Sequence, residues 1–193
     1  MSESGSTMKP EISASDTPWD PPYPHGRPAA IGNMATVAAP FLGGIALALL
    51  GLVLGSPTAF GLIDLSLPLL VVSAVAFIAA VQCGFHARQY VSTPDEIMRW
   101  WPEPNEARRA LLVDEQNECT KLFDRWATRA NRAYNLGLIG LGTATASLLV
   151  PEGGFCSMGA SRLVAFSIVL GAVVVEVAWM LRLIREEKPP QEA

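Results

Sequence analysis

The sequence has few of the residues from which soluble active sites are built. It contains only 2 histidines and 3 cysteines among 193 residues, with no CxxC pair or His/Cys cluster at zinc-ligand spacing. A glycine loop that would cradle phosphate and a nucleophile elbow are also missing. We therefore expect no catalytic residue, no metal and no cofactor, and we do not expect an enzyme.

An excess of positive charge is missing as well. The formal net charge is -4, whereas proteins that bind nucleic acid usually carry a basic patch that neutralises phosphates. We therefore expect no nucleic-acid partner.

Charged residues are nearly absent from four long apolar stretches. Each is close to the roughly 20 residues that one helical crossing of a bilayer needs, and only the last contains an ionisable residue in its interior, Glu176. The stretches are residues 36–54, 65–85, 133–150 and 163–183. Backbone groups find no water inside a bilayer, so each crossing must be helical. The predicted fold is all-α, a polytopic membrane protein with four transmembrane helices and a cytoplasmic helical segment between the second and third.

The connections between these stretches predict the orientation. Short loops rich in Lys and Arg stay in the cytoplasm, and of the 14 Lys and Arg residues only Arg162 falls in an outer connection. We therefore expect a multi-pass protein of the cell membrane with both termini cytoplasmic. The predicted segments are a disordered tail (1–30), a first hairpin (31–85), the cytoplasmic helical segment (86–132), a second hairpin (133–184) and a second tail (185–193).

The three cysteines would lie in three different places in this topology. Cys83 falls in the membrane, Cys119 in the cytoplasm and Cys156 outside. Because no two share a compartment, we expect no disulfide within one chain.

The cytoplasmic segment is predicted to hold two helices. A hydroxyl cap at Thr93, followed by Pro94 and Glu96, begins a short helix that ends near Trp101. Residues 105–132 lack Gly and Pro, so they should run as one helix into the third span. Its apolar stripe could cover the short helix, lie on the membrane surface, or bind a cytoplasmic protein or small anionic ligand at residues 93–132. The candidate residues for a partner or a phosphate are Arg108, Arg109, Arg125 and Arg129.

Every span offers a face of small residues, at steps of three and four in the first three spans. Such faces let helices pack closely in lipid, either within one chain or in a homo-oligomer, and within-chain packing is favoured. The faces are Gly44, Ala48, Gly51 and Gly55; Ser73, Ala76, Ala80 and Cys83 or Gly84; Ala133, Gly137, Gly140, Ala144 and Ser147; and Ala165, Gly171 and Ala172.

Glu176 is the intramembrane polar candidate. A carboxylate in lipid is costly, so it should face the bundle and find a partner on another helix. Gln82 or Asn135 could donate a hydrogen bond to it at that depth. A protonatable or ion-coordinating site is the functional alternative.

Several short motifs in the central third of the chain resemble the uncharacterised small four-span membrane proteins of actinobacteria. They are Arg88-Gln89-Tyr90, Pro94-Asp95-Glu96, Trp100-Trp101-Pro102 and Tyr134-Asn135-Leu136-Gly137. The resemblance implies no established activity. We expect an integral membrane interaction or effector protein, whose cytoplasmic segment senses a partner or signal and whose bundle responds, for example by perturbing the membrane. The alternative is a small proton- or ion-coupled transporter or channel subunit that uses Glu176.

Overall fold

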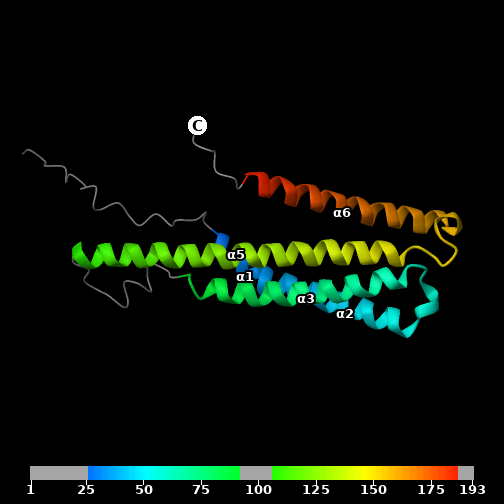
Figure 1. The fold of residues 1–193 in the computed structure, drawn as a ribbon, viewed down its shortest axis with the longest axis horizontal. Helices are drawn as coiled ribbons and strands as arrows, with labels where there is room; N and C mark the ends of the chain where they lie inside the picture. The colour runs from blue at the N-terminus through cyan, green and yellow to red at the C-terminus, as the bar shows by residue number, and fades with distance from the viewer. Residues whose placement is uncertain (1–25, 92–105, 187–193) are drawn as a thin grey trace, which may run out of the picture.

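The computed structural model of the chain describes residues 26–91 and 106–186, with side chains described for 26–91 and 115–182, and every regular element in this part is helical. The predicted short helix from Thr93 to Trp101 lies outside these residues, as does most of both predicted tails. Figure 1 shows long helices lying side by side. In chain order they are α1 (Arg27–Asn33), the π-helical turn η2 (Met34–Ala38), α2 (Ala39–Gly55), the 3-10 turn η3 (Pro57–Ala59), α3 (Ile63–Arg88), α5 (Glu106–Leu148), the 3-10 turn η4 (Phe155–Ser157) and α6 (Ala160–Glu186).

Three of the described helices are long and apolar enough to cross a membrane. They are the continuous helix Arg27–Gly55, which joins α1, η2 and α2, then Ile63–Arg88 and Ala160–Arg182. They contain the first and second predicted spans and all but the last residue of the fourth. The first helix begins at Arg27, before the predicted end of the tail at residue 30, because Pro28 is well suited to a first helical turn.

The third predicted span is shorter and more polar than the other three. It belongs to α5, which ends at Leu148, so only residues 133–148 lie between Arg132 and the end of the helix. This part also carries Thr143 and Thr145, whose hydroxyls donate to the carbonyls of Ile139 and Leu141 at 2.7 and 2.8 Å. A helix covered by its neighbours can be shorter and more polar than one surrounded by lipid.

Helix α5 packs along α3, and small residues make the contact close. The α3 residues Ser73, Ala76 and Ala80 are buried, and so are Gly137 and Gly140 of α5. Toward the other end, the hydroxyls of Ser66 and Ser147 lie 2.7 Å apart. The small-residue faces predicted for these two spans are therefore the faces that pack.

The first span packs through a different face from the predicted one. Gly44, Ala48, Gly51 and Gly55 are all exposed, so this prediction of within-chain packing is wrong. The buried residues of α1, η2 and α2 are instead Ile31, Ala35, Ala39, Gly43, Ala46 and Val53. Steps of four would rotate this face by about 40° each in an α-helix. The π turn, in which the Ala39 N–H donates to the Met34 carbonyl, widens the helix and reduces that drift.

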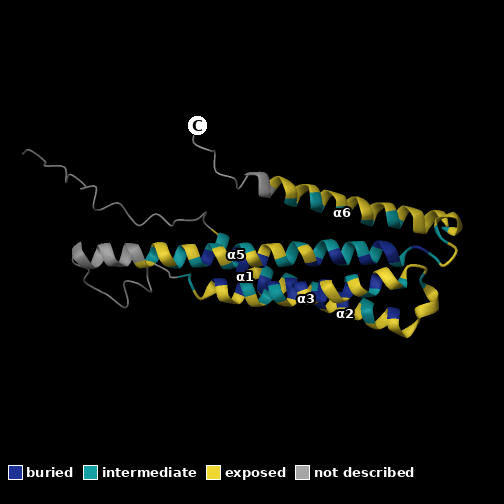
Figure 2. Cartoon of the chain, in the orientation of Figure 1, coloured by how far each residue is buried: buried dark blue, intermediate teal, exposed yellow. Residues whose placement is uncertain are grey.

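Helix α6 lies at the edge of the bundle. None of the residues in the most apolar stretch of α6 is buried. Figure 2 shows this helix largely exposed beside α5. A Cβ added to Gly142 of α5 would meet Val173 of α6 at 2.5 Å, so the two helices touch there. Gly171 and Ala172 are exposed and Ala165 is half-buried. The predicted small-residue face of this span therefore mostly points away from the chain.

Candidate functional site

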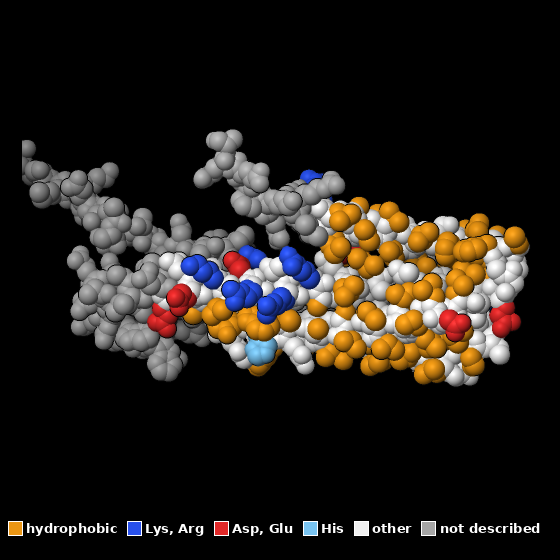
Figure 3. Space-filling view, viewed as in Figure 1, with side chains coloured by type: hydrophobic (Ala, Val, Ile, Leu, Met, Phe, Trp, Pro, Cys, Tyr) orange, Lys and Arg blue, Asp and Glu red, His pale blue; other side chains and the backbone are white. Residues whose placement is uncertain are grey.

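A small core lies where the apolar part of the bundle meets its charged part. Its buried residues are Ile31 of α1, Ala87 of α3, and Phe123 and Ala127 of α5. The half-buried side chains Met34, Tyr90, Val91 and Trp126 surround them. We call these eight residues the cap. Figure 3 shows Lys and Arg side chains gathered at this end of the apolar surface, with acidic side chains beside them, whereas on this face the opposite end shows acidic side chains and no cation.

One ion pair ties α1 to α5 beside the cap. Arg27 Nη1 lies 2.8 Å from Asp124 Oδ1, and the Arg27 guanidinium also lies 5.8 Å from the centre of the Phe123 ring. Both charged side chains are partly exposed, 34% and 46%. Such a pair contributes about 1 kcal/mol or less. Its main consequence is that Arg27 neutralises the Asp124 carboxylate among the cations of α5.

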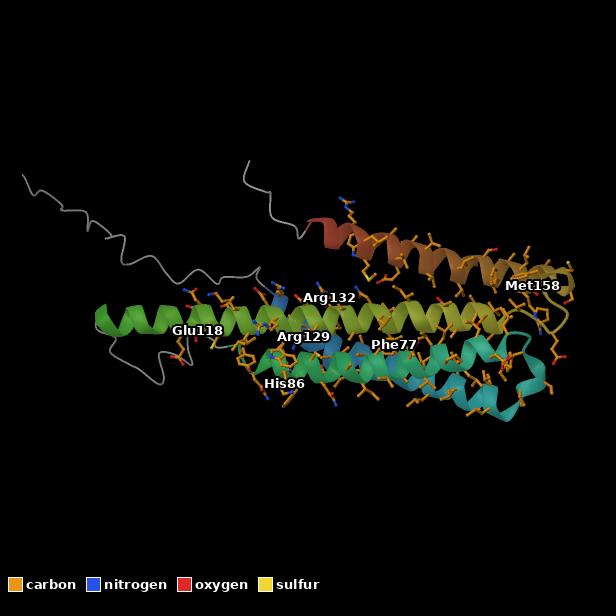
Figure 4. The ribbon with its side chains drawn as sticks, in the orientation of Figure 1. Phe77, His86, Glu118, Arg129, Arg132 and Met158 are labelled. Carbon is orange, nitrogen blue, oxygen red and sulfur yellow. The ribbon has the colours of Figure 1, made fainter. Side chains whose placement is uncertain are left out.

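A stack of three side chains joins the end of α3 to α5. The rings of His86 and Trp126 lie 5.0 Å apart at an interplanar angle of 30°. The Arg129 guanidinium lies 4.9 Å from the centre of the Trp126 ring, within the range of a cation–π interaction. Figure 4 shows His86 and Arg129 at this junction. The stack fixes the level of α3 relative to α5 and orients Arg129.

Four cations form a stripe on α5 next to the cap. They are Lys121, Arg125, Arg129 and Arg132, at steps of four, four and three, and all are exposed. Such steps place side chains on one helix face. Arg125 and Arg129 were candidate residues on the sequence alone. The backbones of Arg108 and Arg109 belong to α5, but their side chains lie outside the described residues.

The predicted partners of Glu176 are distributed over two helices. Glu176 is half-buried on α6 and lies close enough to Tyr134 of α5 for an electrostatic interaction. Asn135 is half-buried on the same helix, next to Tyr134. Gln82 is exposed on α3, and α5 lies between α3 and α6 (Figure 1). The structure therefore does not bring Glu176 and Gln82 together.

Cys119 is a half-buried thiol on the charged part of α5. Burial raises its pKa above the ordinary value, and the charges of Glu115 and Glu118 raise it further. A smaller fraction of the thiol is therefore ionised at a given pH, so Cys119 should react more slowly than an ordinary thiol. Within the described ranges, no group of three or more His, Cys, Asp or Glu residues could hold a metal ion.

Sequence reasoning missed Arg27, His86 and Trp126 as members of one site. They lie on three helices, and no spacing rule connects them. The one available signal was Asp124, an acidic residue surrounded by arginines. No family model, curated protein or solved structure matches the chain.

Proposed function

We propose that the chain crosses the membrane four times, with α5 as the third crossing and both termini in the cytoplasm. The cap and the cation stripe would then lie at the cytoplasmic surface. The charge distribution supports this orientation. Near the opposite end of the bundle the described residues include Asp64, Glu152 and a single cation, Arg162, and such connections are readily translocated.

We further propose that the protein is a membrane-embedded interaction or effector protein. The observation that carries this proposal is the unbroken course of α5 from Glu106 to Leu148. At 1.5 Å per residue the helix is about 65 Å long, and it joins the cytoplasmic part to the close contacts with α3. A partner or anionic signal bound at the cytoplasmic end would therefore move the membrane-embedded end as well. Helix α6, which has little buried surface, is the element that could respond.

Breaking α5 between the cap and its close contacts with α3 should disconnect the two ends. Asn131 is exposed, so Asn131→Pro removes a helical hydrogen bond and kinks the helix without disturbing a core side chain. We expect induced expression of the wild-type chain to depolarise cells, measured with a potential-sensitive dye. Asn131→Pro should reduce this depolarisation several-fold, whereas the matched variant Asn131→Ala should retain it.

Equal amounts of each variant in the membrane fraction are needed for this comparison. Asn131→Gly, which softens the helix without a steric clash, should give an intermediate result. Wild-type cells with an unchanged membrane potential would contradict the effector proposal. So would a proline variant that depolarises cells as strongly as the alanine variant.

Glu176 supports the alternative, an ion-coupled transporter or channel subunit, because it is half-buried against α5. The buried polar side chains of the described bundle give this alternative little support. They are Ser66, Ser73 and Ser147. Each bonds to a backbone carbonyl of its own helix, which leaves little capacity to bind an ion. In the same assay, loss of depolarisation in Glu176→Gln but not in Asn131→Pro would favour the alternative.

A further inference from the structure

The contacts between α3 and α5 show how deep the arginines of the stripe lie. His86 is level with Trp126, since their rings stack, and Phe77 is level with Tyr134, since their ring centres are 5.9 Å apart. Arg129 and Arg132 lie between Trp126 and Tyr134 along α5. They are therefore level with the part of α3 between Phe77 and His86.

The exposed residues of that part of α3 before His86 are Ile78, Gln82 and Phe85, two of which are apolar. This part of α3 carries no charged residue, and its side chains Ile78 and Phe85 are 54% and 63% accessible. In the proposed membrane arrangement these side chains contact lipid tails up to the level of His86. Arg132, six residues further along α5 than Trp126, would be about 9 Å deeper than the border that α3 defines.

A guanidinium at that depth needs an anionic partner. Leaving a charged arginine in hydrocarbon costs about 3 kcal/mol or more, and such side chains reach toward the headgroups. Among the described side chains, Arg125, Arg129 and Arg132 form no ion pair, and the nearby Asp124 is held by Arg27. In the proposed arrangement, three guanidinium groups that have no ion pair among the described side chains therefore lie near the border of the membrane.

We propose that Arg125, Arg129 and Arg132 bind the phosphate of an anionic lipid in the cytoplasmic leaflet. A guanidinium can donate two parallel hydrogen bonds to one phosphate. The Trp126 ring holds Arg129 in place and is itself a side chain suited to the headgroup region. The depth of Arg129 and Arg132 favours a lipid phosphate over a soluble one, because the lipid headgroup sits at that border.

Native mass spectrometry of the full chain in detergent would test this inference. The chain would be titrated with phosphatidylglycerol or with phosphatidylcholine. We expect the wild-type chain to bind phosphatidylglycerol several-fold more tightly, since only this lipid carries a net negative charge. R125Q/R129Q/R132Q should lose the preference. R88Q/R162Q/K188Q, which removes the same number of charges outside the stripe, should keep it.

The outcomes separate this inference from the proposals on which it rests. Equal binding of both lipids by the wild-type chain, or equal loss in the two triple variants, would overturn the lipid site alone. Binding of neither lipid would count against the membrane arrangement itself. Displacement of phosphatidylglycerol by soluble glycerol phosphate would overturn the lipid assignment in favour of a soluble phosphate ligand.

Discussion

Replacing Phe123 by alanine is expected to unfold the cap while the apolar part of the bundle stays folded. Phe123 is fully buried and is the largest side chain among the four buried residues of the cap. It lies outside the proposed membrane, where the hydrophobic effect acts in full. Removing a buried phenyl ring lowers the free energy of unfolding by about 3–5 kcal/mol. A core with only four buried residues does not stay folded after such a loss. Hydrogen exchange should show lost protection for α1 and for residues 115–130, and near-native protection for residues 65–80 and 135–148.

Phe41→Ala is the matched control for this prediction. Phe41 is 69% exposed on α2, so the same change in composition should leave the exchange pattern unaltered. If Phe123→Ala left the cap as protected as in the wild type, the cap would not be a cooperative unit. If Phe123→Ala unfolded the entire chain, the cap and the rest of the bundle would fold as a single cooperative unit.

Replacing Gly137 by leucine is expected to force α3 and α5 apart. A Cβ added to Gly137 would lie 2.8–2.9 Å from three atoms of the Phe77 ring. Phe77 is only 1% exposed, so its ring has no free space into which to move. Overpacking of this kind typically costs about 1–3 kcal/mol, and in lipid the close approach of helices is the main source of their association. A lower thermal midpoint in detergent would reveal the effect.

Two further variants sharpen this test. Gly44→Leu adds the same side chain where nothing lies within 4 Å of a new Cβ, so the thermal midpoint should not change. Phe77→Ala combined with Gly137→Leu exchanges the large and the small partner and should recover part of the loss. A Gly137→Leu protein as stable as the wild type would contradict the packing of α3 on α5. A change in oligomeric state caused by Gly44→Leu would show that the exposed stripe of α2 contacts a second copy.

Apolar length and charge spacing were sufficient to predict most of the helices. The first, second and fourth predicted spans lie in helices long and apolar enough to cross a membrane. The absence of Gly and Pro from residues 105–132 predicted one helix running into the third span, and within the described residues α5 does run unbroken from Glu106 to Leu148. The length and continuity of these helices depend on local composition, which can be read from the sequence.

The buried faces of the helices were harder to predict, because several small-residue stripes compete. The first span offers one stripe through Gly44 and Gly51 and another through Ala39 and Gly43, and only the second fits against Phe77 of α3. The choice depends on a neighbour that is distant in sequence and on the π turn at Met34–Ala38. The same limit applies to the site, where Arg27 meets Asp124 and His86 meets Trp126 only after three helices have assembled.

Two native cysteines allow the central claim, a bundle that crosses the membrane with the cap inside the cell, to be measured directly. Cys156 is exposed within η4, and Cys119 lies on α5 near the cap. Single-cysteine chains would be treated in intact cells with a membrane-impermeant maleimide, at mildly alkaline pH because the pKa of Cys119 is raised. We predict that Cys156 is labelled in intact cells and that Cys119 is labelled only after permeabilisation. Labelling of Cys119 in intact cells, with Cys156 protected, would contradict the orientation.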